Sequence, residues 1–352
     1  MSDRCWKEFW LSGTDGIFHL KATASGIDGN KLISGESQTI PYISRSDSMN
    51  GVKSFVSSKQ KQKYKIDSGN CITIGLDTQT VFYQPHSFFT GQNIQVLRNK
   101  ELSQELALFL VETIRKQMVK FNWGGNGATL GRLARLKIML PVDKNGEPDF
   151  DYMESTIHEL KKAKTIEYRE FLKKELKSIR YVEIPKLDEK EWAAFKLTDV
   201  FKINPGKRLT VSDMKMGNTP FIGASDSNNG ITNFISNRNA SFDRNVLGVN
   251  YNGSVVENFY HPYDCLFSDD VKRFHLKNWK DGKFILLFMK GIILQQKSKF
   301  LYAYKFNEKR MKNQSIMLPV DGNGAPDYSY MEQYIKNIFY TKAKEYLDFK
   351  VR

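Results

Sequence analysis

The feature that most constrains the fold of this chain is an internal repeat. Residues 138–154 and 316–332 agree at 13 of 17 positions, with an offset of 178 residues. Residues 40–52 and 219–231 agree at 7 of 13 positions with an offset of 179, and a third match, FYQP against FYHP, has an offset of 177. Three ordered matches at nearly one spacing indicate a duplicated domain, because the period is far too long for a solenoid.

Each repeat divides into two parts by composition. The first part is rich in β-branched and aromatic residues punctuated by Gly, Asn, Asp and Ser, which predicts a β-rich globule. The second part follows the motif LPVD-x-NG-x-PD and has apolar residues at helical spacing, which predicts an amphipathic helix that begins near Asp149 or Asp327. We therefore expect an α+β fold whose globule, helix, globule and helix occupy residues 1–145, 146–185, 186–323 and 324–352.

The two amphipathic helices would each expose an apolar stripe, and such a stripe needs a cover. We expect the helices to cover one another as an antiparallel coiled coil, which would give a pseudo-twofold molecule with a globule at either end. The pattern assigns to this helix seam the residues Met153, Ile157, Leu160, Met331, Ile335 and Ile338.

The charge and composition of the chain limit the classes of protein to which it can belong. Lys and Arg number 53 and Asp and Glu 39, which gives a net charge of +14, divided equally between residues 1–180 and 181–352. This charge fits either a solvated surface or a polyanion that both repeats contact. A hydrophobic fraction of 40% excludes a disordered chain. With no apolar window of about 18 residues, no signal peptide and three scattered cysteines, we expect a soluble, cytoplasmic protein without a membrane partner.

No catalytic or metal-binding motif stands out. The five histidines form no HExxH pattern, and no CxxC pair occurs. Asp149, Glu159 and Lys161 formally satisfy the PD…ExK pattern of magnesium-dependent nucleases, whose carboxylates must converge on one metal ion. Glu159 and Lys161 would lie about 15 Å along the helix from Asp149, so we expect a helix cap and solvated charges. We predict no catalytic residue and no metal ligand, and keep a self-sufficient nuclease as the alternative.

Polar and basic loops are the remaining chemical feature, since Asn, Ser, Lys and Arg are residue types that contact phosphates and base edges. The candidate DNA-binding residues are Ser44, Arg45, Arg132, Arg135, Lys207, Arg208, Ser225, Asn228, Asn229, Asn250, Asn252, Lys309 and Arg310. Asn-Gly pairs also form turns, so the SDS-x-NG segment common to both repeats equally fits a structural role. Positions that differ between the repeats, such as Arg45 against Ala224, are the better candidates for reading different sequences.

The second repeat carries a resemblance to a known family. GKRLTVSDMKMGNTPFIGASDSNNGITNF, followed by VLGVNYNGSVVENFYHPY and SDDV, resembles the target-recognition domains of type I restriction–modification specificity subunits and of their type IIB (BcgI-like) relatives. The repeated LPVD-x-NG-x-PD segment resembles the boundary between such a domain and the conserved spacer helix. The resemblance covers essentially the whole chain, although nothing in the first repeat matches GKRLT.

The resemblance implies a non-catalytic DNA-specificity subunit, in which each target-recognition domain reads one half of a bipartite double-stranded DNA site. The helices would set the spacer and dock two modification subunits. Those adenine N6-methyltransferase subunits would carry S-adenosylmethionine and magnesium, a restriction subunit could join them, and this chain would hold no cofactor. A purely structural dimerisation module is a further alternative and predicts no salt-dependent DNA affinity. The target bases, the spacer length and the choice between type I and type IIB stay open.

Overall fold

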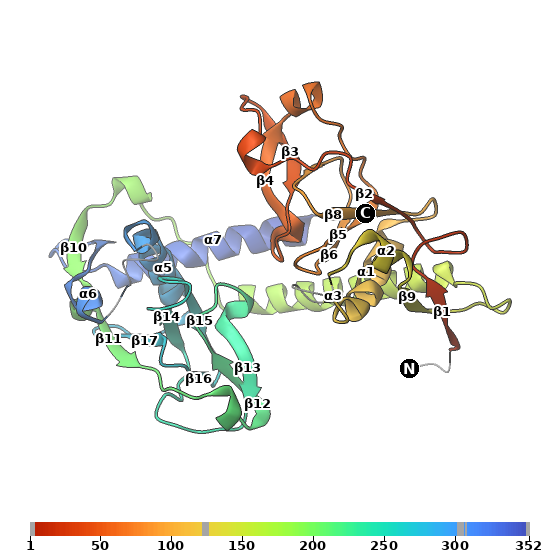
Figure 1. Cartoon of the computed structure of the whole chain (residues 1–352). Helices are drawn as coiled ribbons and strands as arrows, with labels where there is room; N and C mark the ends of the chain where they lie inside the picture. The colour runs from red at the N-terminus through yellow and green to blue at the C-terminus, as the bar shows by residue number, and fades with distance from the viewer. Residues whose placement is uncertain (1–3, 122–126, 301–305, 307, 350–352) are drawn as a thin grey trace. The chain divides into compact units, whose positions relative to one another are not determined.

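The computed structural model describes residues 4–121, 127–300, 306 and 308–349 (Figure 1). The chain forms two compact units, of which the first ends at Tyr168 and the second begins at Arg169. No helix within the described ranges combines the length and the apolar character that crossing a membrane requires.

The first unit contains three small sheets and two short helices before a long one. A two-stranded ribbon pairs β1 with β9, a four-stranded antiparallel sheet has the order β2-β8-β5-β6, and a three-stranded sheet has the order β4-β3-β7. The elements are β1 Trp6–Trp10, β2 His19–Ala22, β3 Gln38–Ile43, β4 Val52–Ser57, β5 Cys71–Gly75, β6 Val81–Gln84, β7 Phe89–Thr90, β8 Ile94–Arg98, α1 Gln104–Met118, α2 Leu130–Ala134, β9 Lys137–Pro141 and α3 Phe150–Leu176.

The second unit repeats this plan strand for strand. Its ribbon pairs β10 with β18, and its larger sheets have the orders β11-β17-β14-β15 and β13-β12-β16. The elements are β10 Trp192–Lys196, α4 Leu197–Val200, β11 Phe201–Pro205, β12 Met216–Ile222, β13 Ile231–Ile235, β14 Val246–Asn250, β15 Asn258–His261, β16 Leu266–Phe267, β17 Val271–Leu276, α5 Lys283–Leu294, α6 Glu308–Asn313, β18 Ser315–Pro319 and α7 Tyr328–Asp348. The predicted α+β fold with an internal duplication is therefore confirmed.

Each unit has its own hydrophobic core between the four-stranded sheet and one helix. In the first unit α1 supplies this helix, and Ser103 begins it by accepting a hydrogen bond at Oγ from the Leu106 amide (3.0 Å). Leu106, Leu110 and Ile114 lie four residues apart and are fully buried, as an amphipathic helix requires. In the second unit α5 takes this place.

The LPVD-x-NG-x-PD motif begins both long helices as predicted. Asp143 closes the turn by accepting hydrogen bonds at Oδ1 from the amides of Asn145 (2.8 Å) and Glu147 (2.9 Å), and the corresponding Asp321 does the same in the second unit. Asp149 and Asp327 then each accept a hydrogen bond from an amide of the first helical turn, both at 3.0 Å. A carboxylate at this position satisfies an unpaired amide and favours the positive end of the helix.

The predicted helix seam needs a correction at two residues. Met153 and Met331 are fully buried in the cores of their own units, so they attach α3 and α7 to the adjacent globule. Leu160 and Ile338 are 53% and 45% exposed. The seam stays a prediction for the other four residues, Ile157, Leu160, Ile335 and Ile338.

Within the second unit, the last turns of α3 do contact α7. The Arg169 guanidinium donates to the carbonyl of Leu347 (2.6 Å), and Lys283 on α5 forms a 2.6 Å ion pair with Glu175. Cations near the carboxyl end of a helix are stabilising, because the last carbonyls there lack helical partners. This contact therefore relies on polar groups that an apolar pattern does not reveal.

Candidate nucleic-acid interface

The SDS-x-NG segment of the first unit forms a turn that joins β3 to β4. The Ser48 amide donates to Ser46 Oγ (3.2 Å), and the two hydroxyl oxygens lie 3.0 Å apart. Asn50 has a left-handed φ of 56°, and its side-chain amide donates to the carbonyl of Tyr83 on β6 (2.8 Å). Gly51 follows at φ 77°. Asn and Gly are the residues that adopt this backbone at least cost, which explains the sequence NG.

The second unit builds the same turn between β12 and β13. The Ser227 amide donates to Ser225 Oγ (3.1 Å), and Asn229, at φ 54°, donates to the hydroxyl of Tyr263 (2.7 Å). These contacts favour the structural role for Ser225 and Asn229. The prediction of a DNA contact at Asn250 is wrong, because this residue is only 1% exposed and its amide is committed to the carbonyl of Ser225 (2.9 Å).

Around this turn, four positions carry side chains of a different chemical type in the two units, and we call them the variable corner. They are Ser44, Arg45, Met49 and Lys53 in the first unit and Gly223, Ala224, Asn228 and Thr232 in the second. Arg45 pairs with Asp77 from the turn between β5 and β6, and its side chain remains 45% exposed. Two hollows of about 620 and 360 Å³ are both lined by Ser44, Arg45 and Lys53. The corner of the first unit therefore combines two cations with concave surface.

Lys207 and Arg208 emerge from a turn directly after β11. The Lys207 amide donates to the carbonyl of Phe267 (2.9 Å), which fixes the backbone while both side chains stay exposed. Gly206 is required here, since a Cβ would lie 1.9 Å from the carbonyl oxygen of Ser268. Arg208 is 80% exposed, and its nearest carboxylate, that of Asp269, is 3.8 Å away. Both cations can reach a phosphate group without breaking a short ion pair.

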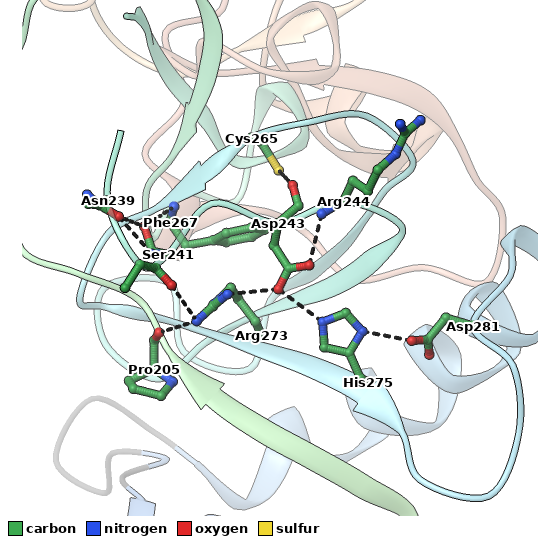
Figure 2. A network of polar contacts seen from close by, with 11 residues as sticks. Pro205, Asn239, Ser241, Asp243, Arg244, Cys265, Phe267, Arg273, His275 and Asp281 are labelled. Carbon is green, nitrogen blue, oxygen red and sulfur yellow. Dashed lines mark hydrogen bonds and ion pairs between the residues drawn. The ribbon is translucent and has the colours of Figure 1, made fainter. Parts of the chain in front are cut away.

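A polar network behind this turn connects several loops of the second unit (Figure 2). Arg273 on β17 donates through Nη2 to the carbonyls of Pro205 (3.0 Å) and Ala240 (3.2 Å), and through Nη1 to Asp243 (2.8 Å). The side chain is 11% exposed. Arg273 thus ties the turn that presents Lys207 to the segment that leads into β14.

His275 extends this network between two carboxylates. Its Nε2 lies 3.0 Å from Asp243 Oδ2, and its Nδ1 lies 2.7 Å from Asp281 Oδ2. The hydrogen bonds to Asp243 and Asp281 raise the pKa of His275 from 6.5 to about 9, against the opposing effect of burial. Burial by itself would raise the pKa of Asp243, but His275 and Arg273 hold it below the ordinary value. The imidazole is therefore a charged structural link at neutral pH.

A second basic feature of this unit, which sequence reasoning missed, is a hollow of about 330 Å³ beside β11. Its lining includes Lys202, Lys272, Lys277 and Lys312 and no carboxylate. Lys272 is 9% exposed and lies 4.9 Å from the centre of the Tyr251 ring. The lysines come from separate elements, so only strand register could have indicated their convergence. By that register, Gln95 takes the place of Lys272 in the first unit.

The remaining candidates lie in three settings. Arg132 donates to the carbonyl of Gly127 (3.0 Å), and Arg135 is exposed directly after α2. Arg310 is partly buried on α6, and the side chain of Lys309 lies outside the described residues. Asn252 donates to Asp270 Oδ1 (2.9 Å). Within each unit, the candidates whose side chains the structure describes therefore lie in separate loop groups.

The nuclease-like residues do not converge. Asp149 pairs with Arg4 and caps α3, and this hydrogen bond from Arg4 lowers the pKa of Asp149. Lys161 instead forms a 2.7 Å ion pair with Glu105 on α1, while Glu159 is exposed. Across the described ranges, no group of three or more His, Cys, Asp or Glu side chains is placed to hold a metal ion. Asp149 and Lys161 are therefore engaged by different structural partners, and the exposed Glu159 does not join them.

The fold and the loops define a class: a duplicated α+β protein whose two units present matching turns with different exposed side chains. The family model for the type I restriction modification DNA specificity domain matches residues 16–168 and, a second time, residues 189–346. The chain therefore belongs to the family of restriction–modification specificity subunits.

The chain is similar to one curated protein and to two solved structures. The chain is 47% identical over 312 residues to the specificity subunit S.BcgI of a type II restriction enzyme from Heyndrickxia coagulans, and the match covers 88% of each chain. A solved type I S subunit from M. genitalium has 14% sequence identity and a TM-score of 0.47, covering 98% of this chain and 92% of that one. The HsdS subunit from Thermoanaerobacter tengcongensis has 13% identity and a TM-score of 0.33, covering 97% and 90%.

Proposed function

We propose that this chain reads a bipartite double-stranded DNA site for a restriction–modification complex, one half-site for each unit. The observation that carries the proposal is the same turn built twice with different exposed side chains, in a chain whose relative S.BcgI is a specificity subunit. A shared backbone conformation would let both units dock on the DNA duplex in the same orientation. Different side chains at the variable corner would then select different bases.

Phosphate contacts would supply most of the affinity. The net charge of +14 is divided equally between the repeats, so each unit can neutralise phosphates on its own half-site. In the second unit we assign this role to Lys207 and Arg208, which are exposed at a fixed turn, and to the hollow lined by four lysines. Contacts of this kind position a protein on DNA and carry no sequence information themselves.

The long helices α3 and α7 would set the distance between the half-sites and dock two modification subunits. We propose that these partners carry the adenine N6-methyltransferase activity with its S-adenosylmethionine and magnesium, and that a restriction activity joins with them. No catalytic role is proposed for this chain, which would act in the cytoplasm with its DNA. The identity to S.BcgI favours a type IIB-like system, which the neighbouring genes would test.

The binding step is tested by fluorescence anisotropy of the purified chain with a labelled duplex over a range of salt concentrations. We expect weak binding whose logarithm falls linearly with the logarithm of salt, by about 0.9 for each phosphate neutralised. A slope near zero would contradict the proposal and favour a structural dimerisation module. Cleavage of the duplex by the chain alone with magnesium would instead support the nuclease alternative.

A further inference from the structure

The turn that carries the variable corner contains two kinds of residue: those that fix the backbone and those that differ between the units. The SDS-x-NG residues keep their identity and their hydrogen bonds in both units, with φ values of 56° and 54° at the paired asparagines. The four positions of the variable corner lie beside or between these residues on the same turn. In a chain that must read two sequences with one fold, side chains that differ on an unchanged backbone are where selectivity can lie.

Arg45 is the side chain of this group best suited to contact a base edge. It follows β3, pairs with Asp77 on the neighbouring hairpin and remains 45% exposed. An arginine has five N–H donors in one plane, and the hydrogen bond from Arg45 to Asp77 engages only Nη1. The guanidinium is therefore oriented by one edge and retains donors for a ligand in the adjoining hollows.

The partner Asp77 argues for a base rather than a phosphate as the ligand. A carboxylate beside a cation repels a phosphate group and lowers the gain from binding it. For base reading the same carboxylate is useful, because it holds the guanidinium fork in one orientation before DNA arrives. By contrast, Arg208, which we assign to phosphate, has its nearest carboxylate at 3.8 Å.

We propose that Arg45 reads a guanine in the half-site of the first unit, donating to O6 and N7, and that Asp77 is its positioning residue. This inference rests on the proposed function and adds the base and the residue. Arginine to guanine O6 and N7 is the pairing that the major groove favours geometrically. Lys53, which lines the same two hollows, would face the flanking backbone.

The second unit has no arginine at the position of Arg45. Ala224 stands in place of Arg45, and Asn252 stands two residues after β14, as Asp77 stands two residues after the corresponding strand β5. Asn252 donates to Asp270 (2.9 Å) and has no guanidinium to orient. The guanine requirement should therefore belong to one half-site only, which separates a specific reader from a general DNA contact.

The test uses the chain assembled with its modification subunits and a plasmid library in which both half-sites are randomised. Methylated sites are sequenced for the wild type, Arg45→Lys, Asp77→Asn and the double variant. Arg45→Lys keeps the charge but loses the planar fork, so we expect preference for guanine at one position of the first half-site to fall by roughly 10- to 100-fold. The second half-site and the salt slope should stay as in the wild type.

Asp77→Asn should relax the same position, and the double variant should be no more relaxed than Arg45→Lys, since Asp77 acts through Arg45. The matched control is Arg180→Lys, an exposed arginine outside the variable corner, which should leave both half-sites unchanged. Thermal unfolding of each variant shows whether a change comes from misfolding.

Three outcomes would overturn the inference. Unchanged selectivity in Arg45→Lys would exclude a base-reading role, as would a uniform loss of affinity in Arg45→Ala with a salt slope lower by about one, which marks a phosphate contact. Loss of methyltransferase assembly with the sequence preference intact would make the corner a protein-docking surface. If the wild type shows no salt-dependent DNA binding, the proposed function itself fails, which is a different result.

Discussion

Replacement of His275 by glutamine should remove a pH-dependent contribution to the stability of the second unit. The pKa of His275 is raised from 6.5 to about 9 by its hydrogen bonds to Asp243 and Asp281. A group with a raised pKa stabilises the fold fully below its unfolded pKa, and this stability is lost as the pH rises through the folded pKa. At about 1.4 kcal/mol for each pKa unit, protonation stabilises the unit by roughly 3 kcal/mol, of which about 2 kcal/mol is lost between pH 6 and pH 8.

Urea unfolding at pH 6 and pH 8 measures this loss. Replacing Trp6, Trp10 and Trp123 by Phe leaves Trp192 and Trp279 as fluorescent reporters, and both belong to the second unit. Burial raises the pKa of the Cys265 thiol to about 12, so the titration of that thiol in the unfolded chain affects stability only above about pH 8.5.

We call the chain with the three Trp→Phe replacements the parent. Between pH 6 and pH 8, we expect the free energy of unfolding of the parent to fall by about 2 kcal/mol more than that of the same chain with His275→Gln. The control is His86→Gln, an exposed histidine of the first unit, which should follow the parent. If the parent and His275→Gln lose stability in parallel, the charged link between Asp243 and Asp281 does not exist in solution.

Three further predictions follow from the fold. Lys207→Ala with Arg208→Ala should weaken binding to all sequences and reduce the salt slope by about one for each lost phosphate contact; a changed methylated sequence would contradict the phosphate role. Met153→Ala should lower the free energy of unfolding by about 3 kcal/mol because the Met153 side chain is fully buried, whereas Leu160→Ala should lower it much less because Leu160 is half-exposed. Equal losses in a denaturant titration would refute this placement. Four residues inserted within 155–168 of α3 should lengthen the helix by about 6 Å and the DNA spacer by roughly two base pairs, with some loss of affinity from the added rotation; altered half-site bases in methylome sequencing would argue against it.

The sequence predicts best what local residues determine. The helix starts at Asp149 and Asp327 follow from short-range hydrogen bonds to the first helical turn, so the PD motif is enough to locate them. The turn at Asn50 is predictable for the same reason, because a left-handed backbone favours Asn or Gly. The duplication extends these local predictions to both units.

The sequence predicts least what depends on contacts between distant strands. Asn250 has a residue type suited to DNA, but it is buried at the end of β14 and its side-chain amide donates to the carbonyl of Ser225, a residue distant in the sequence. Met153 fits an apolar helix face, yet the periodicity could not say whether that face meets its own globule or another helix. The hollow around Lys272 arises from strand register, which no run of basic residues in the sequence signals.

The central claim, that each unit reads its own half-site, is tested most directly by exchanging residues 1–145 for the corresponding domain of a relative with a different target. The methylated adenines of a host that carries the complete system are then mapped by sequencing. The account predicts that one half-site changes to that of the donor, while the other half-site and the spacer stay as they were. A change in the second half-site or in the spacer would contradict it.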